Sequence, residues 1–199
     1  MQSNSFGKVT WLDFKWLNEP KRWNLFRDNL EVFTNLKSDF WQETYYGFKF
    51  NTGHVYGIDI KDNFTIEVCV EANFTTLYDQ AGVMIYLDEK HWLKAGIEYN
   101  DGQPMMGSVL TNDVSDWATG TYTGNPNRFW IRLSRVDKVV CVKYSSDKST
   151  WHLLRLCPFP SADSYFVGVM CCSPQRQDLK VIFHDMALTS PVEDILHSG

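Results

Sequence analysis

From about residue 64 onward, the sequence falls into short apolar or alternating runs that are separated by segments rich in turn-forming residues. Alternation is typical of strands, because successive side chains of a strand point to opposite faces of its sheet. The intervening segments, such as 100–104 and 124–127, contain the Gly, Asn and Pro residues that favour tight turns. The pattern predicts eight strands, over residues 64–71, 81–87, 92–99, 105–111, 129–133, 139–144, 165–172 and 179–186.

No convincing helical stretch, internal repeat or domain linker interrupts this pattern. A chain of 199 residues is long enough for one large sandwich, and 15% aromatic residues favour strands. We therefore expect an all-β fold, a jelly-roll sandwich of two antiparallel sheets, as a single domain over residues 1–199. Residues 1–60 are expected to supply edge strands that wrap a core formed by residues 61–190, and residues 192–196 a short terminal helix.

Charge and hydropathy narrow the set of partners. The formal net charge of -5 disfavours binding to the phosphate backbone of nucleic acids and to anionic membranes. The first seven residues lack the pattern of a secretion signal, and no apolar run approaches the roughly 18 residues that span a bilayer. The expectation is a cytoplasmic protein without a nucleic-acid or membrane partner.

The five cysteines are odd in number and mostly lie in apolar runs, where a free thiol behaves as a small hydrophobic group. Adjacent Cys171 and Cys172 should point to opposite faces of one strand. The five histidines show no metal-ligand spacing, and no Cys-x-x-Cys motif occurs. We expect reduced core thiols, no metal and no cofactor.

The segment 81–99 alternates strictly enough to predict which side chains share a face. Its aliphatic residues should face the core: Val83, Ile85, Leu87, Leu93, Ala95 and Ile97. Placing these residues opposite one another suggests a hairpin register that pairs Ile85 with Ala95. The same register gives the pairs Tyr86–Lys94, Met84–Gly96 and Gly82–Glu98.

The opposite face of this hairpin carries Tyr86, Lys94 and Glu98. Gly96 lies between Lys94 and Glu98, and its missing side chain leaves room for another group. One interpretation is a Lys–Glu pair that neutralises itself on the sheet surface, which contributes little. The other is a ligand-binding pair or the remnant of a catalytic one.

Glycoside hydrolysis needs two carboxylates, about 5–9.5 Å apart, across a cleft. The pattern places only Glu98 on the candidate face, although Asp79 or Glu43 could reach it from loops. The sequence therefore predicts at most one well-placed acid and no catalytic residue. Trp41 and Trp117 stand beside polar residues, as sugar or peptide binding requires, or they close the ends of the sandwich.

Several motifs together resemble a family of poorly characterised concanavalin A-like jelly rolls, the regulation-of-enolase family. They lie at 78–85, 87–89 and 92–99, with further matches at 16–20, 39–41, 111–113, 115–117 and 167–174. The resemblance implies a cytoplasmic protein that controls enolase, with enolase as the partner. It transfers no catalytic residue.

Two hypotheses follow. The first is a non-catalytic regulatory protein that acts on enolase through protein contact. The alternative is a carbohydrate-binding or glycoside-cleaving jelly roll. Its candidate ligand-binding residues are Trp41, Gln80, Tyr86, Lys94, Glu98 and Trp117.

Overall fold

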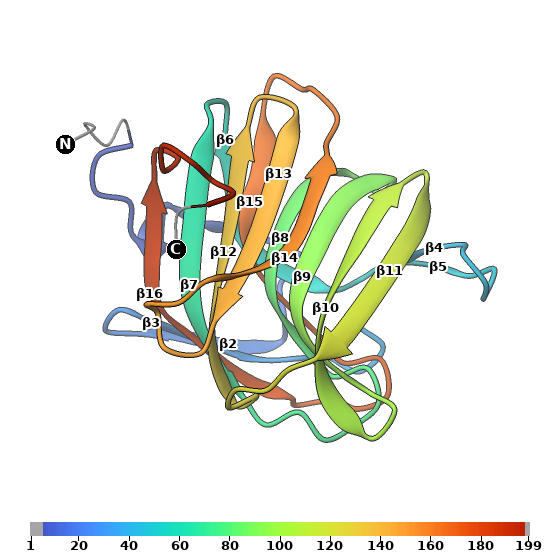
Figure 1. Cartoon of the computed structure of the whole chain (residues 1–199). Coiled ribbons are helices and arrows are strands. Elements are labelled where there is room, and N and C mark those ends of the chain that lie inside the picture. Colours follow the sequence, from blue (N-terminus) through green and yellow to red (C-terminus); the bar gives the residue numbers. More distant parts are fainter. Residues whose placement is uncertain (1–5, 198–199) are drawn as a thin grey trace.

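Two seven-stranded antiparallel sheets lie face to face in the computed structural model, which describes residues 6–197 (Figure 1). The first sheet has the order β1 (Lys15–Leu17), β6 (His54–Ile60), β15 (Tyr165–Cys172), β8 (Gln80–Asp88), β9 (His91–Asn100), β10 (Gln103–Asn112) and β11 (Val114–Thr121). The second has the order β14 (His152–Pro158), β13 (Val139–Ser145), β12 (Arg128–Val136), β7 (Phe64–Ala72), β16 (Lys180–Thr189), β3 (Asn29–Phe33) and β2 (Arg22–Phe26). Strands distant in sequence are thus neighbours in each sheet, which confirms the predicted all-β jelly roll of two antiparallel sheets.

All eight predicted strands are present, with ends that differ by at most three residues. The pattern missed β6, β11 and β14. β11 and β14 are mostly exposed and have little apolar alternation to detect. β1, β2 and β3 lie at or beside sheet edges, whereas β6 lies inside the first sheet, between β1 and β15.

The predicted helix over residues 192–196 is wrong. Residues 195–197 form an isolated turn, in which the Asp194 carboxylate accepts hydrogen bonds from the backbone N–H groups of Leu196 and His197. A single turn held by one side chain lacks the consecutive backbone bonds that sustain a helix. In the described range, the helical structure is a short 3-10 turn, η1 (Trp11–Asp13). That range contains no helix long and apolar enough to cross a membrane.

The main core fills the space between the two sheets. It includes Val83, Ile85, Leu93, Ala95 and Ile97, which confirms the predicted inward face of the hairpin. All five cysteines are buried and free, as expected. Cys171 belongs to the core between the sheets, whereas Cys172 faces the outer side of the first sheet.

The predicted register of β8 and β9 is wrong by two residues. Val83 lies opposite Ala95, and Gly82 lies opposite Gly96. A Cβ atom at Gly82 would lie 1.9 Å from the Ala95 carbonyl oxygen, so this close approach of two backbones requires glycine. A bulge between Tyr86 and Asp88 shifts the pairing by one residue near the turn. Because a shift of two residues preserves the alternation, the predicted faces are still correct.

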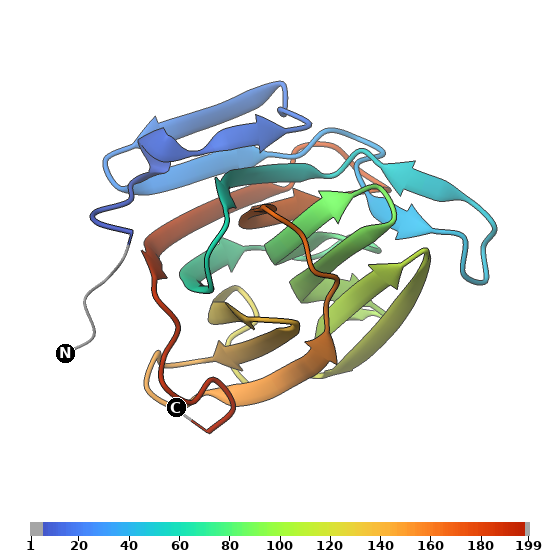
Figure 2. The ribbon, with the colours of Figure 1, turned by 90° about the horizontal axis from the view of Figure 1, so that it is seen from above.

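A second apolar cluster covers part of the outer face of the first sheet. The small hairpin of β4 (Phe40–Gln42) and β5 (Lys49–Asn51) lies above it and projects beyond the sheet (Figures 1 and 2). Phe40 and Trp41 of β4 pack there against Met84, Trp92 and Val109. The hairpin therefore forms one wall over a sheet face that would otherwise be open.

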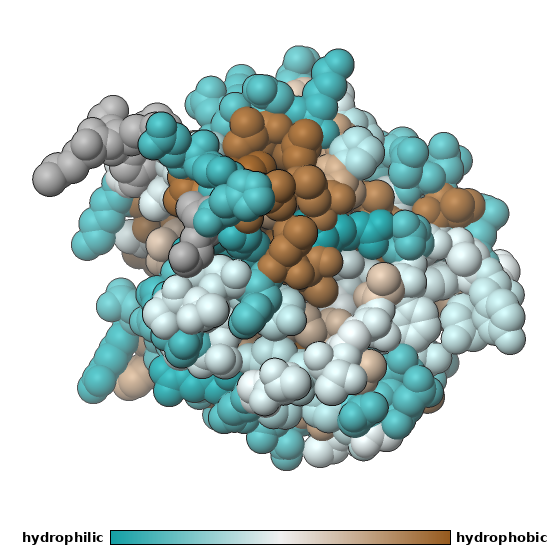
Figure 3. Space-filling view, viewed as in Figure 1, coloured by the Kyte–Doolittle hydropathy of each residue, from teal (hydrophilic) through white to brown (hydrophobic). Residues whose placement is uncertain are grey.

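The outer face of the second sheet has an exposed apolar patch. Figure 3 shows apolar side chains gathered over β13 and β14, where Val139, Leu153 and Leu156 are exposed. This patch belongs to the opposite sheet from the hairpin.

Candidate functional site

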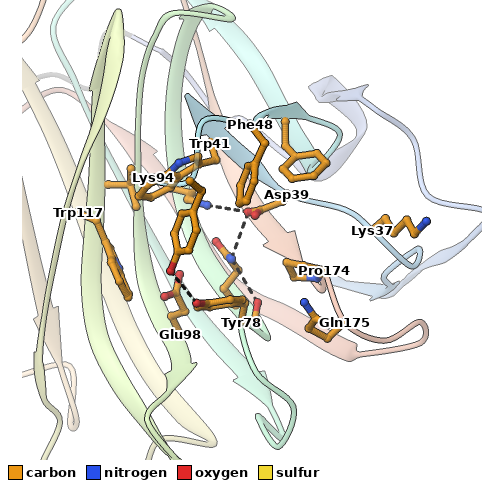
Figure 4. A pocket seen from close by; sticks show the side chains of 14 residues that line it. Lys37, Asp39, Trp41, Phe48, Tyr78, Lys94, Glu98, Trp117, Pro174 and Gln175 are labelled. Atoms are coloured by element: carbon orange, nitrogen blue, oxygen red, sulfur yellow. Dashed lines mark hydrogen bonds and ion pairs between the residues drawn. The ribbon is translucent and has the colours of Figure 1, made fainter. Parts of the chain in front are cut away.

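A pocket of about 440 Å³ opens on the outer face of the first sheet, beside the β4–β5 hairpin (Figure 4). Its polar lining comes from β8, β9 and the segment before β4, and its aromatic lining comes from the hairpin, β11 and residue 78. The lining residues are Lys37, Asp39, Trp41, Tyr46, Phe48, Phe50, Tyr78, Gln80, Lys94, Glu98, Val109, Trp117, Pro174 and Gln175. A volume of this size suits a small molecule.

Lys94 is a buried ammonium that ties β9 to the segment around β4. Its Nζ donates hydrogen bonds to Asp39 Oδ1 at 3.1 Å and to the Phe40 carbonyl oxygen at 2.8 Å. Burial alone would lower the pKa of Lys94, but the negative charges of Asp39 and Glu98 outweigh it and raise that pKa. Lys94 therefore stays charged and holds Asp39 at the pocket.

Asp39 is a second carboxylate at this face, so the prediction of at most one acid is wrong. Its Oδ1 also accepts hydrogen bonds from its neighbour's backbone, Phe40 N–H, at 2.8 Å and from Gln80 Nε2 at 3.4 Å. Asp39 belongs to the matched motif at 39–41, but the sequence pattern could not predict where this residue lies in the fold. The segment before β4 has no alternation that fixes where it packs.

Glu98 differs from Asp39 because none of the described residues donates a hydrogen bond to its carboxylate or pairs with it directly. Burial raises the pKa of Glu98 to about 7, Lys94 opposes that rise, and Asp39 adds to it. Near neutral pH the group therefore exists in both forms. It can donate a hydrogen bond when protonated and accept when ionised.

Aromatic rings flank this polar floor. Trp41 and Trp117 meet edge to face, with ring centroids 6.4 Å apart, and Tyr46 stacks on Phe48 at 5.0 Å. The Tyr46 and Tyr78 hydroxyls share a hydrogen bond of 3.1 Å. Figure 4 shows Trp117 on one side of the pocket, Pro174 on the other, and Tyr78 beside Glu98.

Five of the six candidate ligand-binding residues line this pocket, namely Trp41, Gln80, Lys94, Glu98 and Trp117. Tyr86 does not. It packs beside Phe40, and its hydroxyl accepts a hydrogen bond from Asn51 Nδ2 at 3.3 Å. The register explains this outcome, because Met84 and not Tyr86 lies opposite Lys94.

The observed partners of Lys94 and Glu98 also differ from the predicted ones. Lys94 is hydrogen-bonded to Asp39 and not to Glu98, so the self-neutralising Lys94–Glu98 pair is wrong. The two acids proposed to reach from loops lie elsewhere. Asp79 is fully buried and accepts from Arg176, and Glu43 pairs with Lys49.

The pocket residues that the sequence pattern did not predict come mostly from loops. They include Asp39, Tyr46, Tyr78, Pro174 and Gln175. Loop residues follow no periodic pattern that assigns them to a face. Only the density of aromatic residues over 40–50 signalled a surface of interest.

The sequence of the chain is similar to those of known proteins. A family model described as "Protein of unknown function (DUF1349)" matches residues 16–191. The chain is 47% identical over 184 residues to "Regulation of enolase protein 1" of Saccharomyces cerevisiae, and the match covers 92% of each sequence.

Solved structures agree on the fold. A functionally unknown protein from Saccharomyces cerevisiae aligns with a TM-score of 0.90 and 46% identity, over 92% of this chain and 100% of that chain. A GH43 protein from Bacillus licheniformis aligns with a TM-score of 0.68 and 16% identity, over 94% of this chain but 39% of that one. The lectin I-B4 of Griffonia simplicifolia aligns with a TM-score of 0.55 and 11% identity, over 95% and 97% of the two chains. These two distant likenesses concern the jelly-roll fold alone.

Proposed function

Because this chain belongs to the family described as "Protein of unknown function (DUF1349)", for which that description supplies no activity, we propose a function from its pocket. The protein binds a neutral carbohydrate-type ligand there. The observation that carries the proposal is the combination of aromatic walls, from Trp41, Trp117 and Tyr46, with a hydrogen-bonding floor.

Each part of this pocket matches a feature of sugars. Pyranose rings have apolar faces that stack on aromatic side chains, and hydroxyl groups that both donate and accept hydrogen bonds. Glu98 supplies an acceptor when ionised and a donor when protonated, and Gln80, whose Nε2 already donates to Asp39 and to the Tyr78 carbonyl oxygen, supplies its amide oxygen as an acceptor. Lys94 is already paired with Asp39, and Lys37, the other lysine of the lining, points its ammonium away from the floor (Figure 4). Neutral sugars are therefore preferred to sulfated or uronic ones.

The proposal is binding, not cleavage. Glycosidases use two carboxylates that flank the scissile bond, one of them a free nucleophile or base. In this pocket Asp39 Oδ1 accepts three hydrogen bonds, one of them from a buried ammonium. We assign Asp39 the role of holding Lys94 and the β4 segment in place, which leaves Glu98 as a single acid facing the ligand.

A glycan array together with a panel of aryl glycosides tests this function. The native protein should bind a set of neutral glycans and turn over none of the aryl glycosides. Trp117→Ala should lose binding, whereas Trp151→Ala should keep it. Trp151 is a matched control, since it is also partly buried but packs on Arg132 away from the pocket. Absence of glycan binding would overturn the proposal, and turnover that depends on Glu98 would replace binding by hydrolysis.

The 47% identity to a protein named for the regulation of enolase supports a second function. We propose that the chain also acts in the cytoplasm on enolase, through protein contact. A tagged form of this protein should then enrich enolase from the cytosol of the cells in which it is made. Deletion of the gene for this protein should change the level or the activity of enolase. If neither occurs, this function is ruled out while the glycan proposal stands.

A further inference from the structure

We propose a zinc site formed by Cys69, Glu71 and His184 on the outer face of the second sheet. The three side chains come from neighbouring strands. Cys69 and Glu71 are two residues apart on β7 and share a face, and His184 lies directly opposite Cys69 on β16. Their ligand atoms, Sγ, a carboxylate oxygen and a ring nitrogen, all lie within 4.8 Å of one another.

The donor set points to zinc among the common divalent ions. Thiolate, imidazole and carboxylate are its usual protein ligands, whereas Mg²⁺ and Ca²⁺ prefer oxygen alone. Tetrahedral Zn²⁺ with bonds of about 2.0–2.3 Å separates its ligand atoms by about 3.3–3.8 Å. His184 Nε2 now lies 2.9 Å from Glu71 Oε1, so a small widening of this hydrogen bond would admit the ion.

A second carboxylate lies beside the histidine, just beyond hydrogen-bond distance. Asp185 Oδ2 lies 3.6 Å from His184 Nδ1, the ring nitrogen that faces away from Glu71. A histidine that binds a metal typically has such a partner on its other nitrogen. Asp185 has a φ of 53° and lies in the irregular stretch between His184 and Ala187, where the β16 register shifts. This local bulge places its side chain beside the ring.

Arg128 is the group that opposes the ion. Its Nε lies 3.4 Å from Glu71 Oε1, and its charge also acts on Cys69. Its side chain is 49% exposed, and pairs at such exposure contribute little, so it can move aside. The charges then balance, because a thiolate and a carboxylate neutralise Zn²⁺ and Arg128 can face Asp185. The thiol proton leaves to solvent on binding.

This site would be three-coordinate in protein ligands, with water in the fourth position. Cys69 is buried, while Glu71 and His184 are partly exposed and open a path for the ion. The site lies on the opposite sheet from the sugar pocket, so the two proposals stand independently. The sequence could not indicate it, because His184 is 113 residues from Glu71.

Cobalt substitution tests the site on the full-length, reduced, metal-free protein. Titration with Co²⁺ should give a sulfur-to-cobalt charge-transfer band in the near ultraviolet that saturates at one ion per chain, and Zn²⁺ should abolish it. Cys69→Ser should remove the band. Cys141→Ser is the matched control, because it removes another buried thiol, whose Sγ donates to the Ile195 carbonyl oxygen, and should keep the band.

Two further variants separate ligation from folding. His184→Asn leaves every thiol in place and should weaken Co²⁺ binding at least tenfold, and Asp185→Asn should weaken it about tenfold. Circular dichroism checks that each variant is folded. If the native protein shows no thiolate band, or if the band persists unchanged in Cys69→Ser or in folded His184→Asn, the proposal is wrong.

Discussion

Among single residues, Glu98 links the pocket to the pH dependence of stability. Its carboxyl has a pKa of about 7 in the folded protein against an ordinary value of 4.5. Between these values the folded state holds more protons than the unfolded state. Stability is therefore greatest below the ordinary value and falls as the pH rises to about 7. The full shift in the pKa of Glu98 corresponds to about 3 kcal/mol in the free energy of unfolding. Partial access of this carboxyl to solvent reduces the effect to about 1–2 kcal/mol.

The substitution Glu98→Gln removes this loss, because the amide cannot ionise. Relative to the native protein, the variant should gain about 1–2 kcal/mol in the free energy of unfolding at pH 8 and little at pH 4.5. Urea unfolding at the two pH values measures the difference. An equal effect at both would mean that Glu98 does not ionise within this range.

Lys94 and Asp39 form the pair that anchors β4 to the first sheet. Asp39→Asn leaves the buried ammonium without its main counter-charge and should destabilise the protein by about 3 kcal/mol. The double variant Asp39→Asn with Lys94→Met removes both charges and should recover part of that loss. Chemical denaturation of the two single variants and the double variant gives the coupling between them. Strictly additive losses would show that the pair is not coupled.

These residues also show what the sequence could predict about the site. Lys94, Glu98 and Gln80 lie on long strands whose alternation assigns each residue to a face. Asp39 lies outside any such strand and reaches the pocket because Phe40 and Trp41 pack against the first sheet and Lys94 binds its carboxylate. That packing is a long-range property, which local pattern does not contain.

At the level of elements, the β8–β9 hairpin depends on a pair of facing glycines. Gly82→Ala would place a methyl group against the Ala95 backbone and should cost about 3 kcal/mol or more. Gly120→Ala is the control, since a Cβ there meets no atom within 4 Å, and it should be nearly neutral. Thermal unfolding compares the two. Similar melting temperatures for both variants would contradict the close approach.

The β4–β5 hairpin is expected to contribute binding more than stability. Tyr46→Ala removes the ring that stacks on Phe48 and faces the pocket, so glycan affinity should fall about fivefold or more, the value of about 1 kcal/mol of aromatic contact. Tyr45→Ala, in the same turn, should leave affinity unchanged because its side chain is 93% exposed and does not line the pocket. Calorimetric titration of a glycan bound on the array measures both variants. Equal affinities would place the ligand elsewhere.

Strands were predictable where burial imposed a pattern. β7, β8, β9 and β15 bury one or both faces, and their apolar alternation is plain in the sequence. β4 and β5 have three residues each, too few to show a period. The hairpin register escaped prediction because the glycine contact and the bulge, not aliphatic pairing, determine it.

For the whole molecule, the jelly roll explains how one chain can present two separate candidate sites. The inner faces of both sheets are used by the core, so ligands meet the outer faces. The hairpin builds a pocket on the first sheet, and the pairing of β7 with β16 brings the proposed zinc ligands together on the second. The fold alone sets neither function, since similar sandwiches occur in a lectin and within a GH43 protein.

The central claim is that a neutral sugar occupies the pocket that Trp41 and Trp117 line. The most direct measurement is a nuclear magnetic resonance titration of the eight tryptophan indole N–H signals with soluble neutral oligosaccharides. The account predicts saturable shifts of the Trp41 and Trp117 signals, with those of Trp11, Trp130 and Trp151 unchanged. Unchanged signals from Trp41 and Trp117 across the panel, or shifts confined to the other indoles, would contradict it.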